Sequence, residues 1–319
     1  MKRLFLAVCA AAALWACTWL WLSVSLKTSV EDWFEQRRVD GWTAEHGGIS
    51  VRGFPNRLDV TLTDLVLADP DSGSVWTSPF LQIFRLVYQP GHHIVVFADR
   101  QTLTHKGVVH ELDAQGMRAS VISDVEGRIL RINLESETLN LSGPQRSVAL
   151  AGLSAATSRG ETPERYLLGL TIHRLAGPTT AGIPSDASAV TLRSVVDFDT
   201  PLRLVPDKTR PQIRRIDLRL AELQAHSLML KATGSVDVNA KSQPTGTINL
   251  RADNWREGLA KAKSAKDLPE WLVDLAENAL GALAILGNGT SLDVTLRLDK
   301  GKAWLGILPV GTVPDLRLP

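Results

Sequence analysis

The stretch RLDVTLT, residues 57–63, alternates polar and apolar side chains with a period of two. Successive side chains of a β-strand point to opposite faces, so this pattern predicts a strand with one apolar and one solvated face. The same alternation recurs in the segments 130–134, 190–198, 216–220, 228–238 and 292–298. Turn-forming clusters of Pro, Gly, Asp and Ser occur at 69–73, 89–91, 142–144 and 243–246. The sequence therefore predicts a mainly β, β-rich α+β fold built from antiparallel strands.

The chain begins with a long apolar run, LFLAVCAAAALWACTWLWLSVSL, which covers residues 4–26 without a charge. A helix of this length reaches about 34 Å, and the hydrocarbon core of a bilayer is about 30 Å thick. The run stays apolar past any small-residue cleavage position, and Trp15 beside Ala16 disfavours lipoprotein processing at Cys17. We therefore predict a retained transmembrane helix over 4–26 after a cytoplasmic tail of residues 1–3.

The orientation of this helix follows from the length of the segments on its two sides. Basic residues do not decide it, because Lys2 and Arg3 precede the run and Lys27, Arg37 and Arg38 follow it. A very short basic tail stays inside easily, whereas a long C-terminal region is translocated largely regardless of its charge. The prediction is a single-pass inner-membrane protein with a cytoplasmic N-terminus and the bulk of the chain in the periplasm.

The exported part divides into a short helix and a long β-rich region. Residues 27–41 place Val30, Trp33 and Phe34 at helical spacing, which predicts a juxtamembrane amphipathic helix. Residues 42–319 form the periplasmic β-rich region, and the small, polar stretch 176–188 would divide it into two halves. Capping residues and apolar spacing predict a helix pair over 254–287 that packs on a sheet or plugs its end.

Composition and motifs give no support for catalysis or for nucleic-acid binding. The formal net charge is +1, without the basic excess of a nucleic-acid-binding protein. Both cysteines, Cys9 and Cys17, lie in the apolar run, and the histidines, His92-His93 included, lack the spacing of a catalytic metal site. Walker, GxSxG and dinucleotide-binding motifs do not occur. We expect a protein that is not an enzyme and has no catalytic residues, no cofactor and no metal.

Several segments, in order along nearly the whole chain, resemble the alphaproteobacterial family called domain of unknown function 2125, placed with the AsmA-like group of inner-membrane-anchored periplasmic proteins. The similar segments are WFEQRRVDGW (33–42), SVRGFPNRLDVTLTDL (50–65), WTSPFLQIFRLVYQPGHHIVVF (76–97), MRAS (117–120), NWRE (254–257) and LDVTLRLDKGKAWLGILPVGTVPDL (292–316). The resemblance implies a long curled antiparallel sheet with an apolar inner face. It also implies a role in envelope maintenance or in moving lipid toward the outer membrane. The chain is short for this group, which argues against its bridging the periplasm alone.

These expectations lead to a functional hypothesis with named alternatives. The expected function is that of a non-enzymatic lipid-binding or outer-membrane-assembly accessory protein, whose partners are the inner membrane, phospholipid acyl chains and other envelope proteins. The alternatives are a β-sandwich interaction module with a dry core and, less favoured, a hydrolase. Gly53-Phe54-Pro55 predicts a bend between two strands. Phe54 is therefore the candidate lipid-contacting side chain, the alternative being a core anchor under a tight corner.

Overall fold

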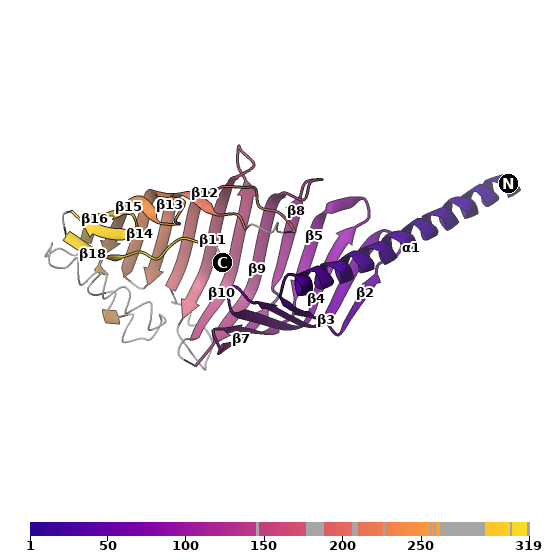
Figure 1. Cartoon of the computed structure of the whole chain (residues 1–319), viewed down its shortest axis with the longest axis horizontal. Coiled ribbons are helices and arrows are strands. Elements are labelled where there is room, and N and C mark those ends of the chain that lie inside the picture. The colour runs from indigo at the N-terminus through magenta and orange to yellow at the C-terminus, as the bar shows by residue number, and fades with distance from the viewer. Residues whose placement is uncertain are drawn as a thin grey trace.

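The computed structural model describes residues 1–319 except 145–146, 177–187, 206–209, 226, 256, 258–259, 262–290, 307 and 318–319. Its described strands all belong to one antiparallel sheet of 18 strands, and a single long helix, α1, leaves the sheet at one end (Figure 1). The predicted mainly β fold with an apolar N-terminal helix is confirmed.

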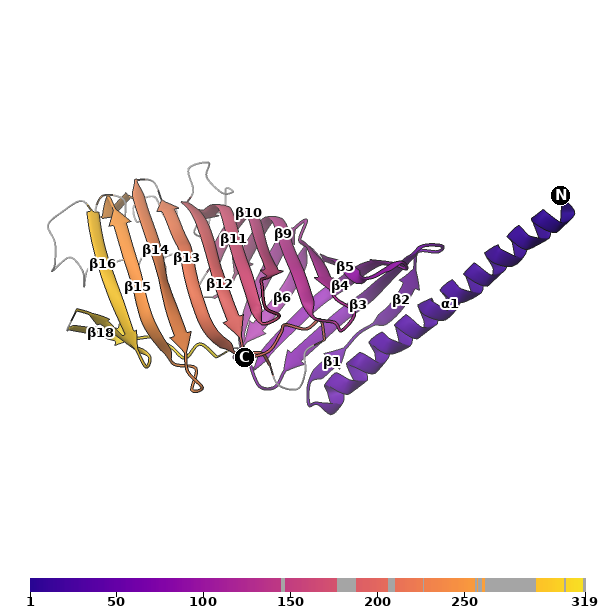
Figure 2. The same ribbon diagram turned by 90° about the horizontal axis from the view of Figure 1, so that it is seen from above.

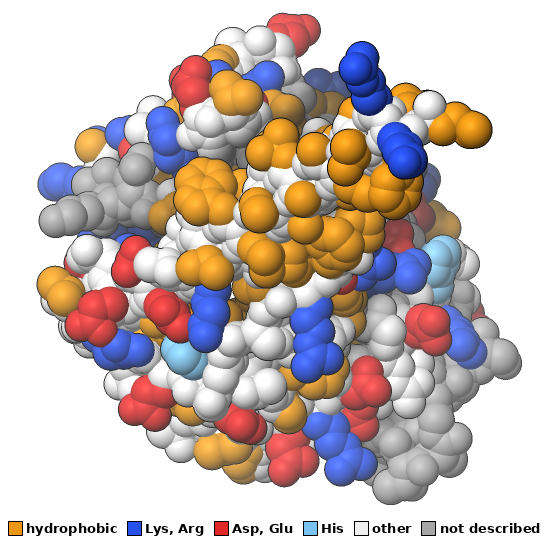
Figure 3. Space-filling model, turned by 90° about the vertical axis from the view of Figure 1, so that its right-hand side faces the viewer, with side chains coloured by type: hydrophobic (Ala, Val, Ile, Leu, Met, Phe, Trp, Pro, Cys, Tyr) orange, Lys and Arg blue, Asp and Glu red, His pale blue; other side chains and the backbone are white. Residues whose placement is uncertain are grey.

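Helix α1 runs without a break from Lys2 to Val39, so the predicted membrane helix and juxtamembrane helix form one element. At 1.5 Å per residue it is about 57 Å long, and its N-terminal part projects beyond the sheet (Figure 2). It is long and apolar enough to cross a membrane, a criterion that a signal sequence near an N-terminus also meets. Viewed from its free end, apolar side chains cover the helix, whereas charged side chains surround it on the body (Figure 3).

The strands follow α1 in an almost continuous series. Their bounds are β1 Thr43–Glu45, β2 Gly48–Arg52, β3 Arg57–Asp69, β4 Ser74–Leu86, β5 Gln89–Phe97, β6 Arg100–His105, β7 Val108–Gln115, β8 Arg118–Ser123, β9 Ile129–Ser142, β10 Ser147–Arg159, β11 Arg165–Ala176, β12 Ser188–Phe198, β13 Ile213–Ala225, β14 Leu228–Val238, β15 Pro244–Asp253, β16 Ser291–Asp299, β17 Lys302–Leu305 and β18 Leu308–Thr312. All six segments with predicted alternation lie within strands of this sheet.

The sheet is a meander with one local branch. β3 pairs with both β1 and β2 on one side and with β4 on the other. β4 then pairs with β5 and β6, which lead through β8 and β7 to β9. From β9 to β18 each strand pairs with the next, including β11 with β12. The sheet therefore continues across the predicted 176–188 boundary, most of which lies outside the described residues, as does most of the predicted helix pair over 254–287.

The sheet is curled along its length (Figures 1 and 2). One result is that Arg210, in the β12–β13 connection, donates a 2.9 Å hydrogen bond to the Asp69 carboxylate at the end of β3. Burial alone would raise the pKa of Asp69, but the hydrogen bonds from Arg210, the Asp71 backbone and Ser72 outweigh it and lower that pKa. The curl thus brings parts of the sheet that are distant in sequence into contact.

Several strands change the phase of their alternation near the middle. On β10 the apolar positions are Leu150 and then Leu153, and the phase changes at Gly152, whose φ is +64°. On β3 it changes at Asp64, which has a φ of +50°. Leu150 and Leu153 pack with the same hydrophobic cluster, so both lie on one face. The pairing register is the same on both sides of Gly152 and of Asp64, so the neighbouring strands change phase at the same place and the apolar side chains stay on that face.

Candidate functional site

One face of the sheet is apolar from β2 to β16, and we call it the inner face and its opposite the outer face. A transverse row of paired residues on the inner face consists of Val51, Val60, Ile83, Val95, Ala119, Leu134, Ala155, Leu170, Leu192, Ala221, Ala232, Leu250 and Val294. All these side chains are apolar. A face of this length needs a covering that keeps it from water.

The two ends of the inner face are covered. At the N-terminal end, Phe34 of α1 is 1% exposed and packs with Ala44, Val60, Leu62 and Leu65, together with apolar side chains of α1 and β4. At the C-terminal end a second cluster of buried residues contains Ile172, Leu175, Ala225, Leu228, Ala252, Trp255, Leu292 and Leu305. The C-terminal half of α1 therefore acts as a lid over the first strands.

Between these clusters the inner face is only half-buried. We call its side chains here the inner tract, which consists of Val95, Val121, Ile132, Leu134, Leu168, Leu192 and Leu218. None of them belongs to a hydrophobic cluster of the described residues. Six steps between paired strands separate Val95 on β5 from Leu218 on β13, which is about 29 Å at about 4.8 Å per step. The tract is an elongated, partly open apolar surface.

Two indole hydrogen bonds hold α1 against the β2–β3 turn. Trp15 Nε1 donates to the Pro55 carbonyl at 2.9 Å, and Trp19 Nε1 donates to the Arg57 carbonyl at 2.8 Å. Trp19 is 8% exposed, although it lies in the apolar run of the sequence. Both carbonyls have a donor that a bilayer could not supply, so this turn is suited to an apolar environment.

Phe54 lies in this turn, outside the inner tract. Its ring is 57% exposed and packs edge-to-face on Trp19, with 5.6 Å between the ring centroids. The neighbouring β4–β5 turn presents Tyr88, which is 66% exposed, and the Val87 N–H donates to the Asn56 carbonyl, which joins the two turns. The structure thus places Phe54 beside α1, and Tyr88 in the turn that is hydrogen-bonded to the Phe54 turn.

Arg85 and His93 interrupt the apolar inner face. They lie directly opposite each other on β4 and β5, and Arg85 also pairs with Leu58, which is 1% exposed. The buried Arg85 Nε has no hydrogen-bond partner, and burial lowers the pKa of this guanidinium. Burial is also the main cause that lowers the pKa of His93, and the charges of Arg85 and His92 lower it further. Both side chains are partly buried, and the lowered pKa of His93 favours its neutral form beside the Arg85 cation.

The outer face carries a hollow of about 550 Å³ over β9 to β13. Leu167, 48% exposed, and Gly169 lie in its lining, together with Arg131, Arg193 and Arg219. The nearby carboxylates on this face, Asp197 and Asp217, are instead paired with Arg165 and Arg215. The hollow is basic at its rim.

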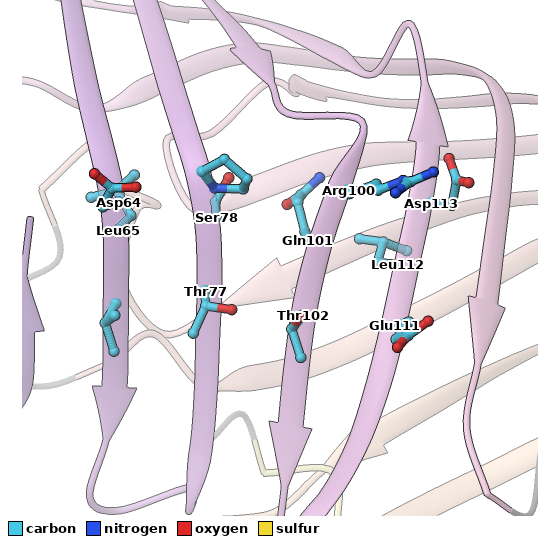
Figure 4. Close-up of a pocket in the computed structure, with 12 residues that line it drawn as sticks. Asp64, Leu65, Thr77, Ser78, Arg100, Gln101, Thr102, Glu111, Leu112 and Asp113 are labelled. Atoms are coloured by element: carbon cyan, nitrogen blue, oxygen red, sulfur yellow. The ribbon is translucent and has the colours of Figure 1, made fainter. Parts of the chain in front are cut away.

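A second hollow, of about 780 Å³, lies where the sheet branches, and its side chains come from β3, β4, β6 and β7 (Figure 4). Its lining includes Asp64, Arg100, Glu111 and Asp113. In the part of the chain that the structure describes, no group of three or more His, Cys, Asp or Glu side chains could hold a metal ion. This hollow therefore offers polar contacts without a recognisable metal centre.

Sequence reasoning missed Arg85, although the sequence contains a signal for it. In the segment LQIFRL (81–86), Leu81 and Ile83 occupy the apolar phase of a strand, and Arg85 occupies the next position of that phase. A cation in an apolar phase is the sequence signature of a charge on a buried face. By contrast, the ring of the adjacent His92 forms a 3.0 Å hydrogen bond with Ser120 Oγ.

Comparisons with known proteins show a family and nothing closer. No curated protein matches the chain, and no solved structure matches it. A model of the family described as uncharacterized protein conserved in bacteria, domain of unknown function 2125, matches residues 19–314. The match begins in α1 and extends to the strands at the C-terminal end of the sheet. The chain therefore belongs to the domain of unknown function 2125 family.

Proposed function

We propose that the protein is a membrane-anchored envelope protein that binds the acyl chain of a lipid on its inner tract. In this proposal α1 is a retained anchor in the inner membrane, the sheet lies in the periplasm, and the protein acts as a non-enzymatic accessory in lipid binding or outer-membrane assembly. Its partners are the inner membrane, phospholipid acyl chains and other envelope proteins. The observation that carries the proposal is the half-buried inner tract between two buried clusters.

The dimensions of the inner tract suit an acyl chain. A hydrocarbon core of about 30 Å contains two leaflets, so one acyl chain reaches about 15 Å, and the tract is about twice as long. Each methylene buried there contributes about 0.8 kcal/mol. The dry β-sandwich alternative requires a second sheet on the inner face, and the described strands all belong to one sheet.

The junction of α1 with the sheet supports a position next to a bilayer. From Lys2 to Trp21 the helix is about 30 Å long, which matches the hydrocarbon thickness. With Trp19 and Trp21 near the outer interface, Phe54, whose ring packs on Trp19, lies at that same level, where aromatic side chains are favoured. The first strands of the sheet then lie close to the membrane surface, and the inner face extends away from it.

The proposal is tested by measuring lipid that co-purifies with the full-length protein in detergent. Leu134→Asp places a charge in the inner tract, and Asn133→Asp places the same charge on the neighbouring outer-face position. We expect extracted lipid to fall at least several-fold in the first variant and to stay at the wild-type level in the second. Circular dichroism confirms that both variants fold. Wild-type protein without lipid, or an equal loss in both variants, would refute the proposal.

A further inference from the structure

Several arginines on the strands of this sheet are paired with a carboxylate, whereas Arg85 is paired with none of the described carboxylates. Arg165 and Asp197 form a bidentate pair with distances of 2.7 and 2.9 Å, and Arg215 lies 3.0 Å from Asp217. Arg85 forms no hydrogen bond or ion pair with any described residue, and burial is the sole cause that lowers its pKa. Within the described part of the chain, its charge is therefore uncompensated.

Arg85 is partly buried and its Nε is fully buried, and a charge that is drawn out of water without a partner is costly. On the adjacent strand β3, Asp59 lies on the outer face and is paired with Arg57. His93, across from Arg85, brings no negative charge, and its own lowered pKa reflects the Arg85 cation after burial. The inner face thus has a place for an anion that the described residues do not fill.

The surroundings of Arg85 have the polarity of an amphiphile. From Arg85 the transverse row on the inner face continues through His93, Val121 and Ile132. Further strands add Thr157 and Leu168 to this row. A cation at one end and apolar side chains beyond it match a headgroup followed by an acyl chain. Arg85 also lies one residue before the end of β4, next to the turn that carries Tyr88 and is hydrogen-bonded to the Phe54 turn.

We infer that Arg85 binds the anionic headgroup of a lipid whose acyl chain lies on the inner tract. The inference rests on the proposed function and specifies its ligand class: an amphiphile with a phosphate or carboxylate oxygen. A guanidinium presents several N–H donors in a fixed geometry that suits such oxygens. His93 lines the headgroup position beside it.

The test compares lipids that differ in headgroup. Full-length protein, stripped of lipid in detergent, is titrated with dioleoylphosphatidylglycerol, dioleoylphosphatidylcholine or oleate, and bound lipid is counted by native mass spectrometry. We expect wild-type protein to prefer the two anionic lipids, and Arg85→Gln to reduce that preference about tenfold or more. Arg85→Lys keeps a positive charge and should retain part of it. Inorganic phosphate has no acyl chain and should not displace phosphatidylglycerol; displacement would overturn the lipid assignment.

The matched control is Arg131→Gln, which removes an arginine of the outer face that likewise has no ion pair among the described residues. It should leave the headgroup preference unchanged. An unchanged preference in Arg85→Gln, or an equal change in Arg131→Gln, would overturn the inference while leaving acyl-chain binding intact. Leu134→Asp should weaken all three lipids alike, and a wild-type protein that binds none of them would refute both proposals. The melting temperature of lipid-free Arg85→Gln should not fall, because the variant removes an unpaired, partly buried charge.

Discussion

Phe34→Ala tests how firmly α1 is attached to the inner face. The Phe34 ring is 1% exposed, packs with Val60, Leu62 and Leu65, and makes edge contacts to Trp33 and His46 with centroid distances of 5.1 and 4.7 Å. Removing a buried Phe ring costs about 3–5 kcal/mol. With an unfolding entropy of about 2.1 cal/mol/K per residue over 319 residues, this loss lowers the melting temperature by about 4–8 °C.

The assay is thermal unfolding of the full-length protein in detergent, together with hydrogen exchange of α1 and β1 to β3. The control is Val39→Ala on the same helix, where the side chain is 73% exposed and the expected change is within about 0.5 kcal/mol. Phe34→Ala should also speed exchange in the last turns of α1, because the lid loses its main anchor. Equal melting temperatures for the two variants would show that α1 does not pack on the sheet as described.

Two further predictions concern the sheet itself. Asp69 has a lowered pKa, so its pairing with Arg210 stabilises the fold above the ordinary carboxyl pKa near 4 and is lost as the pH falls through the lowered value. Asp69→Asn should therefore cost about 1 kcal/mol at pH 7, with a difference from wild type that vanishes in acid; a difference independent of pH would contradict this. Gly152→Ala should cost about 1–2 kcal/mol in chemical denaturation, because φ is +64° and the new Cβ would lie 2.5 Å from His173 Cδ2. The control Gly169→Ala meets no atom within 4 Å and should change stability little.

The strands of the C-terminal half were predictable because their alternation is nearly unbroken. Residues 228–238 and 292–298 keep one apolar phase and lie in β14 and β16. The strands β4 to β8 were harder to predict, because β6 and β8 are short and the pairing of β4 with β5 is irregular at its end. The phase change at Gly152 also divides β10 into two short patterns that do not read as one strand.

The position of Phe54 could not be predicted, because it depends on contact with Trp19, which precedes it by 35 residues in the sequence. The bend at Gly53-Phe54-Pro55 is evident from residue types, and the structure has a turn there. Phe54 contacts Trp19 because α1 continues past the apolar run. The strands β1 and β2 then lead the chain back along the helix. Local periodicity contains no information on this docking, which is set by the burial of Phe34 and its neighbours.

The central claim is that a lipid acyl chain lies on the inner tract, and photocrosslinking tests it most directly. Full-length protein is reconstituted with phosphatidylglycerol that carries a diazirine in its acyl chain, irradiated and mapped by mass spectrometry. We predict adducts at Ile132, Leu134 and Leu168 of the inner tract. Leu167 is the internal control, because it is apolar and 48% exposed but lies on the outer face. Adducts at Leu167 equal to those at Leu168, or adducts confined to α1, would contradict the account.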